Sequence, residues 1–93
     1  MEMGHHFWER LADRAELETE SMPGVPLVEI IGTGRVLVEN HRGVKAYSRE
    51  RIVIGTKSGC VSVCGCSLEL MRMSKERLII CGRIDAVHLE RGR

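Results

Sequence analysis

The fold is predicted from a stretch in the middle of the chain, Val38-Glu39-Asn40-His41-Arg42-Gly43-Val44. Polar or turn-prone residues, Glu39 to Gly43, here separate two short segments, 35–38 and 44–48, in which apolar and polar side chains alternate. Alternation with a period of two is typical of strands, and Gly43 supplies the positive φ that a short loop usually needs. We therefore predict that this stretch is the tip of a β-hairpin.

The same alternation continues through the chain from Leu27 onward. Its short apolar segments follow one another every eight to ten residues, with glycine or polar residues between them. This spacing is typical of an all-β domain, and short connections favour antiparallel neighbours. We predict a mainly β fold, an antiparallel meander or small sandwich of seven to eight short strands. The predicted strands are 27–31, 35–39, 44–48, 51–55, 60–64, 67–71, 77–81 and 84–89.

Alternate residues of a strand point to the same side of a sheet, and here one side is apolar in almost every segment. This side is the predicted core, formed by Val36, Val38, Val44, Ala46, Ile52, Ile54, Val61, Val63, Leu68, Leu70, Leu78 and Ile80. The other side is mixed, with charged residues beside Leu37, Tyr47, Val53, Cys60, Met71, Ile79 and Cys81. We expect an N-terminal helix or a second copy of the sheet to cover part of this mixed side.

A seven-residue motif that occurs twice supports the strand assignment. Ser48-Arg49-Glu50-Arg51-Ile52-Val53-Ile54 returns twenty-six residues later as Ser74-Lys75-Glu76-Arg77-Leu78-Ile79-Ile80. In both copies the polar tetrad is predicted to be a turn that leads into a strand. The repeat and the even strand spacing leave a short parallel β-solenoid as the alternative fold.

The N-terminal residues have a helical period instead. Phe7, Leu11 and Ala15 recur at i, i+4 and i+8, opposite an acidic side, which predicts an amphipathic helix over 5–20. We predict three parts: an N-terminal helix (1–22), a Pro-containing linker (23–26) and a β domain (27–90). The helix is expected to pack on its own domain or on a neighbouring subunit. A membrane-surface helix is the alternative, but anionic lipid would repel its acidic side.

Length and charge narrow the class of protein. Ninety-three residues suit one domain, and a domain this small often completes its core with a partner or oligomer. The formal net charge of +1 argues against a dedicated nucleic-acid binder. The sequence contains no pattern of a signal peptide or a membrane span, so a soluble, cytoplasmic protein is expected.

The four cysteines, Cys60, Cys64, Cys66 and Cys81, are expected to be reduced, because disulfides are rare inside cells. A zinc site is the alternative, but Cys64 and Cys66 are separated by one residue rather than the usual two to four. The sequence also lacks a catalytic triad order, a glycine-rich phosphate loop and a pair of carboxylates in an evident cleft. We therefore expect no enzyme activity, no metal and no cofactor.

The segment from Glu39 to Gly43 also carries a family resemblance, together with Tyr47-Ser48, Gly59, Gly65 and Gly82-Arg83-Ile84. With the apolar strand positions around them, these residues resemble the YabP/YqfC family of sporulation proteins over roughly residues 23–90. The helix before the linker is similar to the YqfC branch. The four cysteines are not part of the family pattern.

The resemblance implies a non-enzymatic protein of endospore formation, made in the mother cell. It implies a location in the mother-cell cytoplasm, at the membrane that surrounds the forespore, beside a membrane-protein partner similar to YqfD. Our hypothesis is a structural or assembly module that self-associates through sheet edges or the mixed side. Its candidate partner-binding residues are Glu39, Asn40, His41, Arg42 and Gly43, with Asn40 and Gly43 expected to form the turn.

A binding module for nucleic acid or another anionic ligand is the alternative function. It would use the cations around the predicted hairpin, which are Arg35, Arg42, Lys45, Arg49 and Arg51. Only three aromatic residues are present in the chain, and Tyr47 is the only one among the predicted strands. This leaves little surface for stacking bases.

Overall fold

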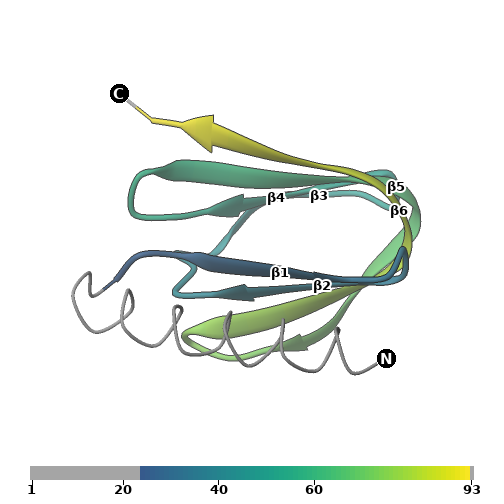
Figure 1. The fold of residues 1–93 in the computed structure, drawn as a ribbon, viewed down its shortest axis with the longest axis horizontal. Helices are drawn as coiled ribbons and strands as arrows, with labels where there is room; N and C mark the ends of the chain where they lie inside the picture. Colours follow the sequence, from purple (N-terminus) through teal and green to yellow (C-terminus); the bar gives the residue numbers. More distant parts are fainter. Residues whose placement is uncertain (1–23, 93) are drawn as a thin grey trace, which may run out of the picture.

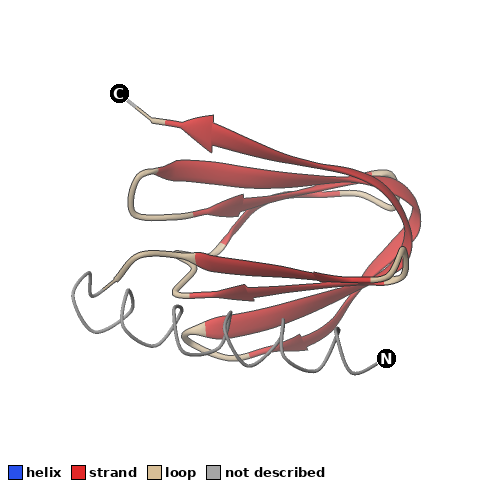
Figure 2. Cartoon of the chain, in the orientation of Figure 1, coloured by secondary structure: helices blue, strands red, loops and turns tan. Residues whose placement is uncertain are grey.

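The structure, a computed structural model, describes residues 24–92 (Figure 1). These residues form strands joined by short connections and contain no helix (Figure 2). The strands are β1 (Leu27–Ile31), β2 (Arg35–Glu39), β3 (Val44–Tyr47), β4 (Arg51–Gly55), β5 (Gly59–Met73) and β6 (Arg77–Arg91). The prediction of a mainly β fold is confirmed. The helix predicted within residues 1–22 lies outside the described residues.

The six strands form one sheet in the order β1-β2-β6-β5-β4-β3, and every neighbouring pair is antiparallel. A parallel β-solenoid is therefore wrong, and so is a simple meander, because β6 lies between β2 and β5. The predicted hairpin tip at residues 38–44 is wrong as well. β2 pairs with β1 and β6, whereas β3 pairs with β4.

Two strands are much longer than predicted. Segments 60–64 and 67–71 belong to one strand, β5, and segments 77–81 and 84–89 belong to β6. Both strands bend in the middle, where the β5–β6 register shifts between Cys64 and Gly65 and again between Cys66 and Glu69. Extra residues in a strand increase its bend and twist. At this bend the sheet folds over on itself (Figure 1).

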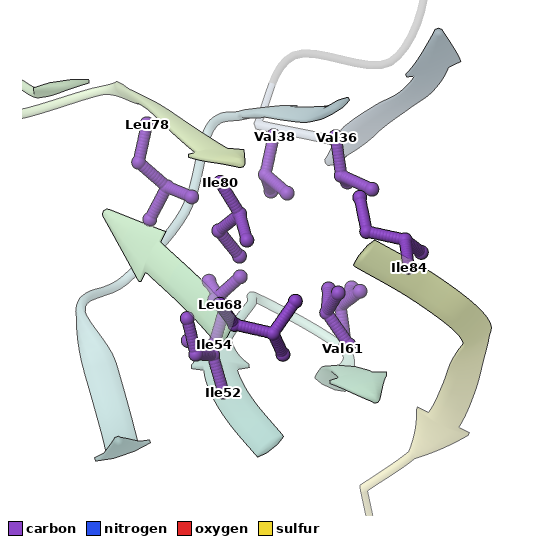
Figure 3. Close-up of a cluster of buried hydrophobic side chains, with 10 residues drawn as sticks. Val36, Val38, Ile52, Ile54, Val61, Leu68, Leu78, Ile80 and Ile84 are labelled. Carbon is purple, nitrogen blue, oxygen red and sulfur yellow. The ribbon is translucent and has the colours of Figure 1, made fainter. Parts of the chain in front are cut away.

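The fold divides the sheet into two parts. The β1–β2 half contains β1, β2, residues 77–81 of β6 and residues 69–73 of β5. The β3–β4 half contains β3, β4, residues 59–64 of β5 and residues 86–91 of β6. The inner faces of the two halves enclose the hydrophobic core (Figure 3).

The core confirms most of the predicted apolar side. Its buried residues are Val36, Val38, Ile52, Ile54, Val61, Val63, Leu68, Leu78, Ile80 and Ile84, and Val44 and Leu70 pack against it partly buried. Ala46 was predicted in the core but is exposed. A register shift between Val44 and Ala46 places Ala46 opposite Val53, on the outer face. One bulged residue thus reverses the faces of the rest of the strand.

The repeated motif forms two equivalent turns, as predicted. Ser48 and Ser74 each accept a hydrogen bond at Oγ from the backbone N–H of an arginine, Arg51 at 3.0 Å and Arg77 at 3.2 Å. The backbone N–H groups of the two serines donate in return to the carbonyl oxygens of the same arginines, at 2.8 and 2.7 Å. Each serine begins a three-residue connection, 48–50 between β3 and β4 and 74–76 between β5 and β6.

Candidate functional site

Residues 40–43 connect the two halves of the sheet. At one end, the backbone N–H of Asn40 donates to the carbonyl oxygen of Glu76 at 2.6 Å, in the β5–β6 turn. At the other end, the N–H of Arg42 donates to the carbonyl oxygen of Gly55 at 2.7 Å, at the end of β4. This segment therefore crosses from the β1–β2 half to the β3–β4 half.

The bend of β5 is a second crossing with the same kind of anchor. There the N–H of Gly65 donates to the carbonyl oxygen of Glu50 at 3.0 Å. Glu50 and Glu76 occupy equivalent positions in the repeated motif. Each of the two polar turns thus holds one place where the chain passes between halves. β6 makes a third crossing at residues 82–85, where the N–H of Gly82 donates to the carbonyl oxygen of Gly34 at 3.2 Å.

His41 is built into the crossing, with only 8% of its surface exposed. The backbone N–H of Gly43 donates to its Nδ1 at 3.0 Å, and Nε2 lies 2.9 Å from the carbonyl oxygen of Ser74. Because Nδ1 accepts and a carbonyl oxygen can only accept, the geometry assigns the ring proton to Nε2. Both ring nitrogens are therefore occupied by backbone groups of this chain.

Asn40 and Gly43 are predicted to form a turn, and they lie instead in the crossing segment. Both have positive φ angles, 62° at Asn40 and 99° at Gly43, a region that asparagine and glycine tolerate better than most residues. The Asn40 side chain also donates from Nδ2 to the carbonyl oxygen of Val25 at 2.8 Å. It thereby fixes the residue that precedes β1 by two positions.

Glu39 and Arg42 are the remaining two of the five candidate partner-binding residues. Arg77 donates from Nε to Oε2 of Glu39 at 2.8 Å and forms an ion pair with the same oxygen. The Arg42 side chain is exposed. The sequence could not identify Val25 and Ser74 as partners of the segment. Both accept through the backbone carbonyl, a group that every type of residue has.

The cations predicted around one hairpin do not share a hairpin. Arg35 lies on β2 in the β1–β2 half, whereas Lys45 and Arg51 lie on β3 and β4. The Lys45 side chain lies over Gly55 on the outer face of the β3–β4 half. The fold therefore separates Arg35 from the other members of the set.

The histidine, cysteine and acidic side chains of the described residues are dispersed. Among residues 24–92, no three histidine, cysteine or acidic side chains come close enough together to hold a metal ion. The four cysteines are free thiols, and the Cys60 thiol donates to Glu90 at 3.7 Å. In the same part of the chain no helix has the length and apolar character needed to cross a membrane.

Replacing His41 with alanine is expected to lower the free energy of unfolding by about 2–3 kcal/mol, because it leaves the Gly43 N–H and the Ser74 carbonyl without partners in a largely buried site. Arg42→Ala, which removes an exposed side chain of the same segment, should change stability by less than about 0.5 kcal/mol. Urea denaturation followed by circular dichroism measures both. Equal stability losses for the two variants would contradict the structural role of the imidazole.

Comparisons with known proteins agree with the resemblance drawn from the sequence. The model of the YabP family matches residues 23–93, a range that contains the whole sheet and the crossing segment. The uncharacterized protein YqfC of Bacillus subtilis (strain 168) is 25% identical over 72 residues, which cover 77% of this chain and 77% of YqfC. No solved structure matches the chain.

Proposed function

Because this chain belongs to the YabP family, we propose that it is a non-enzymatic sporulation protein, a self-associating assembly module that docks on a membrane-protein partner. It acts in the mother cell, at the membrane around the forespore. The family membership and the similarity to YqfC support a role in sporulation. The outer edge of β1, which has no partner strand among residues 24–92, is the observation that carries the assembly role.

A non-enzymatic role agrees with the state of the functional groups in the crossing segment. A general base needs an available lone pair within reach of a substrate. The lone pair of His41 is engaged by Gly43 and its ring N–H by Ser74, while Glu39 is paired with Arg77. Neither side chain is available to start proton transfer without first breaking contacts that hold the fold.

The two edges of the sheet differ in how well they suit addition of another strand. β1 pairs with β2 in unbroken register over all five residues, and its other edge has no partner among the described residues. Ile30 and Ile31 on this edge are 53% and 51% exposed. β3 instead contains a bulge and Lys45, two features by which proteins protect edges from pairing. The self-association is therefore assigned to β1.

The test is the oligomeric state of the full chain at micromolar concentration, measured by light scattering and native mass spectrometry. The wild-type protein should be oligomeric, and Ile30→Lys should shift it to monomer by placing a charge on the β1 edge. Tyr47→Lys is the matched control, because Tyr47 is also 53% exposed but lies on β3. A wild-type monomer at every concentration, or dissociation by Tyr47→Lys alone, would refute the assignment.

Docking on the membrane protein is assigned to the crossing segment, with Arg42 as its exposed side chain. Recovery of a YqfD-like membrane protein with the tagged chain from sporulating cells should fall in Arg42→Glu. Arg49→Glu, a charge reversal in the exposed β3–β4 turn, serves as the control. Equal recovery with all three proteins would exclude Arg42 from the contact.

The anionic-ligand alternative makes a different prediction. Residues 24–92 carry eleven lysines and arginines and seven acidic residues, a formal charge of +4. A binding module would give a mobility shift with an oligonucleotide that weakens steeply as salt rises. The assembly role predicts no such shift at physiological salt.

A further inference from the structure

The outer face of the β1–β2 half carries apolar side chains, set among charged ones, that the described residues leave uncovered. By the strand register, its side chains point away from the buried core positions Val36, Val38, Leu78 and Ile80. We call this surface the outer patch. Its members are Leu27, Ile31, Leu37, Met71, Ile79 and Cys81.

Two contacts across the strands join members of the outer patch. Leu37 on β2 lies directly opposite Ile79 on β6. The Cys81 thiol contacts the Met71 sulfur at 3.0 Å, so the bulged residue of β5 also lies on this face. Met71 is 63% exposed and Ile31 51% exposed. Exposed apolar side chains gathered on one face suit a contact with another segment.

The corresponding face of the β3–β4 half differs in character. Around Val53, it carries the hydroxyl of Ser62, the imidazole of His88 and the carboxylate of Glu90. Ser62 donates to Glu90 at 3.1 Å, so the centre of that face is polar and internally satisfied. Among the described residues, the exposed large apolar side chains of Leu27, Ile31 and Met71 lie on the outer face of the β1–β2 half, and none lies on the outer face of the β3–β4 half.

We propose that the outer patch is the docking surface for the N-terminal segment of the same chain, residues 1–22, bound through the side that carries Phe7, Trp8 and Leu11. The inference does not depend on the proposed function. It rests on the position of the patch, on where the described chain begins, and on charge.

The chain enters the sheet beside the patch. Asn40 holds the carbonyl of Val25, and β1 begins two residues later with Leu27, itself a member of the patch. A helix over 5–20 would be about 24 Å long at 1.5 Å per residue. Four strands spaced about 4.8 Å apart cover about 14 Å between the outer strand axes, and five residues cover about 17 Å along a strand, so a helix of this length spans the half in either direction. The helix can therefore lie across the half without a long connection.

The opposite net charges of the two parts of the chain favour the N-terminal segment as the occupant of the outer patch. Residues 1–23 carry six carboxylates and two arginines, a formal charge of −4, against +4 for residues 24–92. The outer face itself is balanced, because Arg35, Arg72 and Arg77 share it with Glu29, Glu39 and Glu69, so the attraction comes from the net charge of the whole β domain. The acidic side of the segment is attracted to the sheet and repelled by an anionic membrane. A four-residue linker also gives the attached segment a millimolar effective concentration, which favours its own sheet over that of a second copy.

Trp8 is the only tryptophan of the chain, so its fluorescence reports on docking in the full-length protein. We expect blue-shifted emission and shielding from acrylamide at all protein concentrations. Met71→Glu and Ile79→Glu should shift the emission to the red and increase acrylamide quenching. Val53→Glu is the matched control, because Val53 is half-buried like Ile79 but lies on the outer face of the other half. It should leave the emission unchanged.

Far-UV circular dichroism identifies any variant that fails to fold, and Met71→Glu, at a largely exposed position, keeps the test valid if Ile79→Glu unfolds. Solvent-exposed emission from the wild-type protein would overturn the proposal. Shielding that disappears on dilution would assign the patch to a second copy instead. Shielding that appears only with phosphatidylserine-containing vesicles would assign the segment to a membrane surface.

Discussion

Gly65→Ala is expected to lower the free energy of unfolding by about 3 kcal/mol, because a methyl group at this position overpacks a site enclosed by backbone. A Cβ on Gly65 would collide with the carbonyl oxygen of Arg83, on the strand paired with it. Backbone on both sides cannot move apart without opening the β5–β6 pairing at the bend. Urea denaturation followed by circular dichroism measures the loss.

Gly34→Ala is the matched control for this substitution. A Cβ at Gly34 would meet only the carbonyl oxygen of Gly82, at an ordinary contact distance of 3.8 Å. Its φ does not lie in the left-handed region, so alanine should change stability by less than about 0.5 kcal/mol. Similar unfolding midpoints for the two variants would show that the bend tolerates a side chain at Gly65.

Ile80→Ala is expected to cost about 3–4 kcal/mol, because it removes methyl and methylene groups from the centre of the core and leaves a cavity. Ile80 is fully buried between Val36 on β2 and Leu70 on β5. It lies at the point where the inner faces of the two halves meet (Figure 3). Its loss therefore weakens the packing of both halves.

Ile30→Ala tests the same chemical change at an edge. Ile30 lies opposite Val36 and faces the core side, but β1 has no further described strand beside it and the side chain is 53% exposed. We expect a cost below about 1 kcal/mol, since little buried surface is lost. Equal costs for Ile30→Ala and Ile80→Ala, measured by chemical denaturation, would contradict the position of the core.

The local properties of the sheet followed from the sequence. Alternation at Val36 and Val38, and at Ile52 and Ile54, predicted which side of each strand is buried. The repeated tetrads predicted the two turns at Ser48 and Ser74. The buried side of a strand depends on a period of two, and the turns depend on short-range hydrogen bonds. Both can be predicted from residues that are neighbours in the sequence.

The lengths of the two central strands, β5 and β6, could not be predicted from the alternation of apolar and polar residues. Gly65 and Gly82 interrupt the alternation, and such an interruption predicts a turn when its surroundings are unknown. In the structure these positions lie inside β5 and β6, where the strands bend and the register shifts. The bulge in β3 likewise exchanged the faces after Val44 and moved Ala46 out of the core.

Sequence alone determined that this chain forms antiparallel strands with one apolar side, polar turns and the YabP family pattern around residues 39–43. Only the tertiary structure decided that these residues cross between two halves of a folded sheet, with His41 buried in the crossing. Four polar residues between two strands fit a hairpin and a crossing equally well. The choice depends on partners far along the chain, such as the carbonyl of Ser74, thirty-three residues from His41.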